Sequence, residues 1–120
     1  MPAVTFDKSK RLLNASAFQA VFDRAQYKVG HQHFLILAVR TSLGHPRLGL
    51  VIGKKNIRRA VQRNRVKRVV RETFRLNLDS LDSLDIIFLA RKGFDTLQPS
   101  LQTRIMSETW QRLAAKVADK

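Results

Sequence analysis

The strongest chemical signal in this chain is a block of basic residues at positions 54–75. It contains ten Lys or Arg residues and one acid, Glu72, in a chain of 120 residues whose formal net charge is +14. Residues 76–120 carry as many acidic as basic groups, so most of the excess charge is local. A helix with this charge density repels itself, and a polyanion beside it removes that repulsion. The block therefore predicts contact with a nucleic-acid backbone.

The spacing within the block is helical from about residue 59 and separates a polar side from an apolar side. The polar side comprises Asn64, Arg68, Arg71 and Arg75, flanked by Arg65 and Lys67. The apolar side comprises Val66, Val69, Val70, Thr73 and Phe74. Ile57, Ala60 and Val61 lie off the apolar side, which predicts an irregular first turn or separate packing under the preceding loop. The amide of Asn64 donates and accepts hydrogen bonds, so it can contact a sugar hydroxyl or a base edge.

The residues that could carry catalysis or bind a metal form only weak patterns. His31 and His33 have the spacing of paired metal ligands on one side of a strand, but the chain has no Cys and no carboxylate completes the set. Asp79, Asp82 and Asp85 could hold the Mg²⁺ of a nuclease, although polar turn residues before a strand explain them better. We expect no catalytic residue, no metal site and no cofactor bound by the protein itself.

Residues 49–55 superficially suggest a phosphate-binding loop. A P-loop has four residues between its glycines and a Ser or Thr after its Lys, whereas this chain has three residues between Gly49 and Gly53, and Lys55 follows Lys54. The intervening residues are typical of a strand. We expect Gly53 to end that strand, with Lys54 and Lys55 facing outward.

Around the basic block, the pattern predicts an α+β domain. Ser16 and Gln19 have capping-box spacing at the start of a predicted helix over residues 15–24. Strands are predicted at 26–30, 34–40, 47–53 and 85–91, and the short loop after residue 40 favours an antiparallel hairpin of the second and third strands. A final helix begins near Pro99. Its apolar side comprises Ile105, Met106, Thr109, Trp110, Leu113 and Val117. The helices are expected on one face of the sheet, in a two-layer α/β sandwich.

Length and composition favour one domain over residues 1–120, with residues 1–8 and 117–120 flexible. The N-terminus has no apolar run of signal-peptide length, and nothing approaches the roughly 18 consecutive apolar residues of a membrane span. The lack of Cys allows a reducing compartment, and we expect a cytoplasmic protein.

Four segments resemble the bacterial ribonuclease P protein subunits. Two of them are RLGLVIGKK at 47–55 and AVQRNRVKRVVR at 60–71. The second contains Arg63-Asn64-Arg65 where that family has its Arg-Asn-Arg signature. SAFQAVF at 16–22 is similar to the family's first helix, and DIIFLARK at 85–92 to its last strand. The resemblance covers roughly residues 9–115, and the signature with its basic flanks is its most specific part.

The resemblance implies a four-stranded sheet with three helices in the order α-β-β-β-α-β-α and a left-handed βαβ crossover. It also implies a division of labour in an endoribonuclease. A large RNA subunit with bound Mg²⁺ removes the 5′ leader of precursor tRNA, while the protein binds the leader and supports metal-dependent cleavage. The implied partners are ribonuclease P RNA and precursor tRNA, with no membrane and no small-molecule substrate.

The resemblance also implies two binding surfaces. The catalytic RNA would contact Lys54, Lys55, Arg58, Arg59, Arg63, Asn64, Arg65, Lys67, Arg68 and Arg71. The leader would bind in a cleft lined by Phe18, Phe22, Phe34 and Leu37. Some family members have an aromatic residue where this chain has Leu37. From the residues alone, Phe18 and Phe22 are either core or a stacking platform for unpaired bases, and we expect Phe22 to be the more structural of the two.

Two other functions fit the charge. A ribosomal or ribosome-assembly protein would bind structured RNA without an enzymatic role, and the same fold occurs there. A basic amphipathic helix for anionic membranes fits less well, because the apolar side is modest and is needed for the core.

Overall fold

The computed structural model describes residue 11 and residues 15–118, and it has the α+β architecture predicted from the sequence. Its helices are α1 (Ala15–Arg24), α2 (Ala60–Leu76) and α3 (Pro99–Ala118). Its strands are β1 (Tyr27–His31), β2 (Phe34–Arg40), β3 (Arg47–Val51) and β4 (Leu84–Ala90). Two short 3₁₀ turns, η2 (Leu78–Ser80) and η3 (Phe94–Thr96), follow α2 and β4. None of the helices described is long and apolar enough to span a bilayer.

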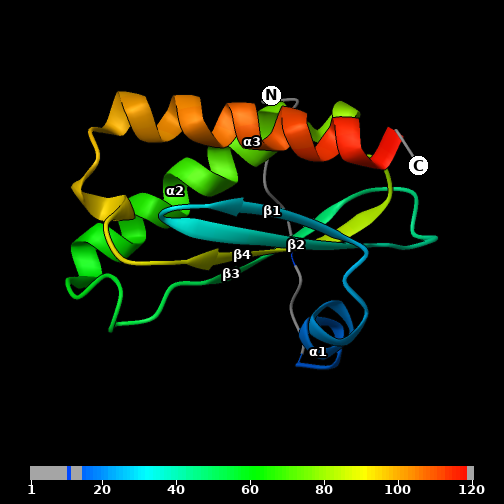
Figure 1. The fold of residues 1–120 in the computed structure, drawn as a ribbon, viewed down its shortest axis with the longest axis horizontal. Helices are drawn as coiled ribbons and strands as arrows, with labels where there is room; N and C mark the ends of the chain where they lie inside the picture. The colour runs from blue at the N-terminus through cyan, green and yellow to red at the C-terminus, as the bar shows by residue number, and fades with distance from the viewer. Residues whose placement is uncertain (1–10, 12–14, 119–120) are drawn as a thin grey trace, which may run out of the picture.

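The four strands form one mixed sheet in the order β1-β2-β4-β3 (Figure 1). β4 pairs antiparallel with β2 and parallel with β3, so it separates the two strands that the sequence predicts as a hairpin. That predicted hairpin is wrong. The antiparallel hairpin is instead β1–β2, which turns between His31 and Phe34. β4 takes the central place because nearly all of its residues are buried, and a strand between two neighbours is covered on both faces.

The helices lie on both faces of the sheet. α2 and α3 pack together on one face, whereas α1 lies on the other, as Figure 1 shows. The prediction that the helices share one face is therefore wrong for α1. The cause is the alternation along β2, where Ile36 faces α2 and α3 while Leu37 faces α1.

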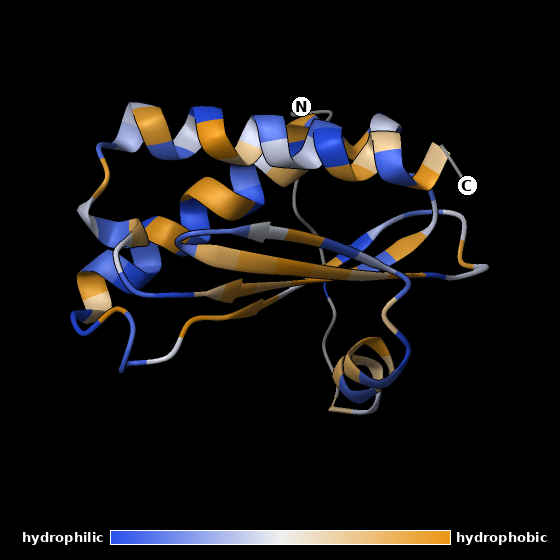
Figure 2. Ribbon diagram, in the orientation of Figure 1, coloured by the Kyte–Doolittle hydropathy of each residue, from blue (hydrophilic) through white to orange (hydrophobic). Residues whose placement is uncertain are grey.

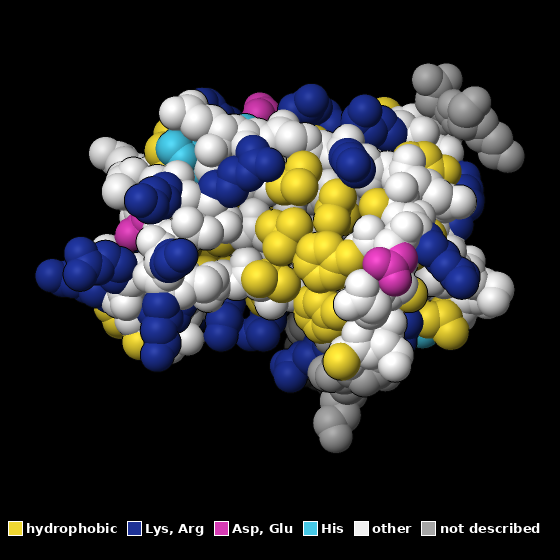
Figure 3. All heavy atoms as spheres, turned by 60° about the horizontal axis from the view of Figure 1, so that its bottom comes forward, with side chains coloured by type: hydrophobic (Ala, Val, Ile, Leu, Met, Phe, Trp, Pro, Cys, Tyr) yellow, Lys and Arg dark blue, Asp and Glu magenta, His cyan; other side chains and the backbone are white. Residues whose placement is uncertain are grey.

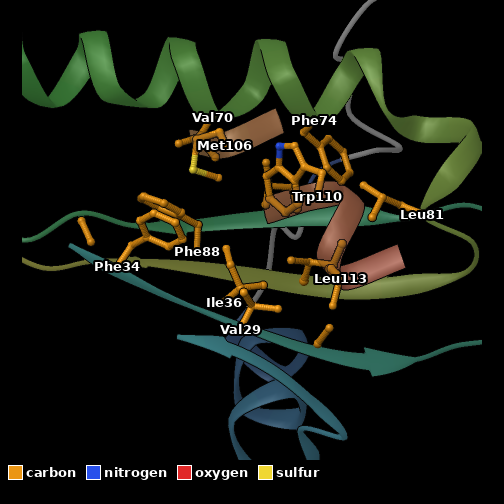
Figure 4. Packing of buried hydrophobic residues seen from close by; sticks show 14 of the residues in the cluster. Val29, Phe34, Ile36, Val70, Phe74, Leu81, Phe88, Met106, Trp110 and Leu113 are labelled. Atoms are coloured by element: carbon orange, nitrogen blue, oxygen red, sulfur yellow. The ribbon is translucent and has the colours of Figure 1, made fainter. Parts of the chain in front are cut away.

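The main core lies between the sheet and the pair α2–α3 (Figure 4). Phe74 of α2 and Trp110 of α3 meet edge-to-face at a centroid distance of 5.6 Å, and the Trp110 indole N–H donates to Thr73 Oγ1 at 2.9 Å. The apolar side predicted for α3 is confirmed, with Ile105 at its half-buried margin. Figure 2 shows apolar residues of both helices toward the sheet and polar residues outward.

The predicted bounds of α1 are confirmed, whereas its predicted cap and the ends of β3 and α3 differ from the prediction. Ser16 lies within α1, which begins at Ala15, so Ser16 is not the residue that caps it. β3 ends at Val51, before Gly53. α3 continues through Ala118 with Val117 buried, so residues 117 and 118 are not a flexible tail; residues 1–8, 119 and 120 lie outside the described part of the chain.

Candidate nucleic-acid interface

The outward side of α2 presents the predicted basic stripe. Asn64, Arg65 and Arg68 are exposed, while Lys67 and Arg71 are half-buried at its margins. The helix is fixed by its opposite side. That side buries Val66, Val70, Thr73 and Phe74 against the core. Packing therefore orients α2 so that its cations face solvent.

The loop before α2 extends this basic surface. Lys54, Lys55, Arg58 and Arg59 are all exposed. Between them, the Asn56 and Ile57 backbone N–H groups donate to Gly53 O at 3.1 Å, and the fully buried Ile57 side chain anchors the loop. Ile57 thus packs separately before the helix, as the pattern allows, whereas Ala60 and Val61 are exposed.

Arg63, the first residue of the Arg-Asn-Arg signature, points partly inward. Its Nη1 donates to Ile57 O at 3.0 Å and to Arg58 O at 2.8 Å. These bonds tie the first turn of α2 to the preceding loop. Arg63 consequently shapes the surface on which Arg65 and Arg58 are displayed.

The cations of the stripe are less exposed toward the C-terminus of α2. Arg75 forms an ion pair with Glu72, the acid of the block. Arg71 is half-buried. Burial, and secondarily the nearby Arg11, lower the pKa of its guanidinium, which nevertheless remains charged. The exposed, uncompensated charge is therefore concentrated between residues 54 and 68.

A second surface lies on the sheet face that carries α1. Val21 of α1 packs on Leu37 and Ile87, and Leu35 and Leu89 remain half-exposed beside that contact. Figure 3 shows an apolar patch near the middle of this face with Lys and Arg side chains around it. The arrangement suits an unpaired strand, because bases can contact apolar side chains while cations contact the backbone.

Two of the residues predicted for the leader cleft do not line this surface. Phe34 has 0% exposure and packs with Phe88 and Phe94 in the main core, on the opposite face of the sheet. Leu37 faces the predicted side but lies beneath α1 with 6% exposure. Both predictions are wrong because β2 is apolar on both faces, so its composition does not show which alternate residues reach solvent.

The aromatic residues of α1 have the reverse of their expected roles. Phe22 is 44% exposed, whereas Phe18 is half-buried against the cluster around Val21. The expectation that Phe22 is the more structural residue is wrong. Phe18 lies three residues before Val21 and Phe22 one after it, so the turn of the helix places Phe18 nearer than Phe22 to the buried contact of Val21.

The candidate metal residues serve structural contacts. His31 Nδ1 accepts a hydrogen bond from the His33 backbone N–H at 3.1 Å, and its ring stacks on Phe34. His33 Nδ1 lies 2.8 Å from the Lys92 carbonyl oxygen. Burial, His33 and Arg112 together lower the pKa of His31. These contacts hold the β1–β2 turn against the end of β4.

The acidic cluster does not converge on a common point. Asp85 is paired with Arg47, and Asp82 lies 3.6 Å from Arg40. In the part of the chain that the structure describes, no group of three or more His, Cys, Asp or Glu residues is arranged to hold a metal ion. These carboxylates therefore do not fit a Mg²⁺ site.

The sequence reasoning overlooked the residues that form the exposed apolar floor. Leu35, Leu89 and Val51 occupy one row, because Leu35 pairs with Leu89 and Leu89 with Val51 across the sheet. Val51 is exposed at the edge strand. Side chains alternate between the two faces of a strand, so Leu35 lies on the same face as Leu37. Once the face of Leu37 is known, this alternation identifies Leu35.

Comparison with known proteins now assigns the family. The family model described as Ribonuclease P matches residues 6–114. The chain belongs to the ribonuclease P protein family. A ribonuclease P protein component of Marinobacter nauticus is 52% identical over 116 residues, covering 97% of this chain and 87% of the relative. One from Pseudomonas aeruginosa strain PAO1 is 51% identical over 108 residues, covering 90% and 80%.

Solved ribonuclease P proteins share the fold. The Staphylococcus aureus protein superimposes with a TM-score of 0.78 at 28% identity, covering 89% of this chain and 96% of that one. The Thermotoga maritima protein gives 0.74 at 25% identity, covering 85% and 96%. The four-stranded sheet with its three helices is therefore that of the ribonuclease P proteins, as the sequence resemblance implies.

Proposed function

We propose that this chain is the protein subunit of a ribonuclease P ribonucleoprotein that removes the 5′ leader of precursor tRNA in the cytoplasm. The observation that carries the proposal is the presence of two distinct surfaces on one small domain. One is the cationic surface of residues 54–68, and the other is the apolar patch beside α1. Family membership supplies the context in which both surfaces have an RNA partner.

The cationic surface is the proposed binding site for ribonuclease P RNA. Arg65 and Arg68 supply phosphate contacts, since exposed guanidinium groups form charge-assisted, often bidentate hydrogen bonds with phosphate oxygens. Asn64, exposed beside them, contacts a sugar hydroxyl or base edge. Lys54, Lys55, Arg58 and Arg59 extend the site along the loop.

The patch beside α1 is the proposed binding site for the single-stranded leader. Phe22 offers an exposed aromatic face on which a base can stack, and Leu35, Leu89 and Val51 provide an aliphatic floor. Aliphatic side chains contact every base similarly, so this floor favours leader binding with little sequence preference. Phe18 supports α1 from below through its packing on the Val21 cluster.

Cleavage chemistry is assigned to the RNA subunit, with Mg²⁺ used by the holoenzyme. The carboxylates of Asp82 and Asp85 are each directed to an Arg partner, and we assign no catalytic residue, cofactor site or small-molecule substrate to the protein. Its contribution is to neutralise RNA charge and to retain the substrate. Both effects are largest where Mg²⁺ is scarce, because the metal and the protein cations screen the same phosphates.

The test is precursor-tRNA cleavage at low Mg²⁺ by the ribonuclease P RNA, with and without this protein. We expect the protein to accelerate cleavage at the mature 5′ end, and the RNA-free protein to cleave nothing. Specific 5′ cleavage by the protein alone that disappears in Asp79→Ala or Asp82→Ala would overturn the assignment. Stable co-purification with ribosomal RNA and no effect on precursor cleavage would instead favour a ribosomal role.

A further inference from the structure

A basic pocket lies where the loop before α2 meets the turn after β4. Its volume is about 380 Å³, and its cationic walls are Lys55, Arg58 and Arg59 on one side and Lys92 on the other. Asp95 is the acid in the lining. Figure 1 shows the two chain segments side by side at the end of the molecule where α2 begins. Residues far apart in the sequence therefore converge on one site of net positive charge.

The α2 side of the pocket is held by hydrogen bonds to the main chain. Asn56 Nδ2 donates to Ala90 O at 2.9 Å and so fastens the loop to the end of β4. The contact from Arg63 to Arg58 O fixes the loop where it enters the helix. Lys55 and Arg58 consequently extend from a backbone that is already ordered.

The opposite side is fixed just as firmly. The Lys92 carbonyl oxygen lies 2.8 Å from His33 Nδ1, and Gly93 has φ +97 with the His33 ring where a Cβ would be. Phe94 is fully buried in the main core. The turn that carries Lys92 and Asp95 is thus anchored on both sides of the pocket mouth.

Given the function proposed above, on which this step rests, we propose that the pocket binds a backbone phosphate of ribonuclease P RNA. Four cations around one cavity match the charge of a phosphodiester, and Lys and Arg are the residues that contact phosphate oxygens most often. The walls adjoin α2 and its loop rather than the apolar patch, which favours the catalytic RNA over the leader. Lys92, outside the basic block, becomes a contact residue of the RNA-binding surface.

Binding of the folded full-length protein to a ribonuclease P RNA transcript at several salt concentrations tests this inference. Lys92→Gln should lower the steepness of log affinity against log salt by about one, which is roughly a tenfold loss at 0.1 M salt. Asp95→Asn should instead strengthen binding, a gain that partial unfolding cannot produce. Arg104→Gln, which removes an exposed cation from the outer side of α3, is the matched control and should change the slope little.

The outcomes separate this inference from the function on which it rests. The pocket proposal is wrong if Lys92→Gln weakens binding no more than Arg104→Gln does. It is also wrong if Asp95→Asn binds the transcript with wild-type affinity. In either case Arg65→Ala can still show that α2 binds RNA. A wild-type protein that does not bind the transcript overturns both. If Lys92→Gln weakens binding of isolated leader-bearing precursor but not of the transcript, the phosphate belongs to the substrate, and the assignment to catalytic RNA is wrong.

Discussion

Arg47 and Asp85 lie directly opposite each other in the parallel pair β3–β4 and form a two-point ion pair. Arg47 Nε donates to Asp85 Oδ1 at 2.8 Å, and Nη2 donates to Oδ2 at 2.6 Å. The hydrogen bond to Asp85 raises the pKa of Arg47. The Asp85 side chain is only 8% exposed, so its charge depends on this one partner. The pair joins the edge strand to the centre of the sheet.

Removing Arg47 should therefore be costly. Arg47→Gln leaves a buried carboxylate without its cation, and we expect the free energy of unfolding to fall by about 2–4 kcal/mol, less than for a fully buried pair because Arg47 is partly exposed. Denaturant melts measure the change. Asp82→Asn, in the exposed pair with Arg40, is the control and should cost less than about 1 kcal/mol. Equal losses in the two variants would mean that the Arg47–Asp85 pair contributes little.

The two aromatic residues of α1 should respond differently to truncation. Phe22→Ala should cost little stability but weaken precursor binding by about 1–3 kcal/mol, the loss expected for one stacked base. The affinity for mature tRNA should not change. Phe18→Ala should mainly lower stability, by up to about 3 kcal/mol, because its ring is half-buried in the α1 cluster. Precursor and mature tRNA affinities, measured beside a melt, distinguish these effects. An unchanged precursor-to-mature ratio in Phe22→Ala would remove Phe22 from the leader site.

The basic stripe of α2 predicts distinct salt dependences for its members. Arg65→Ala and Arg68→Ala should each reduce the slope of log affinity against log salt by about one, since each removes one phosphate contact. Asn64→Ala should weaken binding with little change in slope, because it carries no charge. Glu72→Gln frees Arg75 from its ion pair and should strengthen binding modestly. Unchanged slopes in both Arg variants, with folding intact, would show that RNA binds elsewhere.

Two glycines with similar φ angles should differ in their tolerance of alanine. Gly93 has φ +97, and a Cβ there would lie 2.6 Å from a His33 ring carbon; Gly44 has φ +90 with open space around it. Gly44→Ala should cost only the left-handed strain, about 1 kcal/mol, whereas Gly93→Ala should cost about 2 kcal/mol or more. Thermal melts of the two variants provide the comparison. Similar losses would mean that the His33 ring moves aside without cost.

His31 should make stability depend on pH. Its pKa is lowered from the ordinary value of 6.5, so below that pH the unfolded chain binds the proton more readily than the folded protein. The contribution of His31 is therefore complete above about pH 6.5 and is lost as the pH falls toward its folded-state pKa. As the pH falls from 7 to 5, the free energy of unfolding of the wild type should decrease relative to that of His31→Asn. A constant difference across that range would contradict this assignment.

The sequence predicted local structure well where one side of an element is polar. The helical period of residues 59–75 located α2 and its exposed Arg65 and Arg68, because mixed polar and apolar residues mark the two sides of a helix. β2 offers no such contrast, so neither the face of Phe34 nor the side on which α1 packs could be predicted. The inward orientation of Arg63 could not be predicted either. The sequence does not show which Arg side chain lies within hydrogen-bonding distance of backbone carbonyl oxygens.

The position of β4 between β2 and β3 also sets the order in which the chain can fold. Arg47 and Asp85 are 38 residues apart in sequence, so β3 gains its partner strand only after α2 has been synthesised. Before β4 emerges from the ribosome, β2 and β3 each present an apolar edge without its final neighbour. Closing such long-range pairs is slow compared with forming a helix or the β1–β2 hairpin. The native sheet therefore cannot be completed before β4 is available, because β4 is the strand that joins β3 to β2.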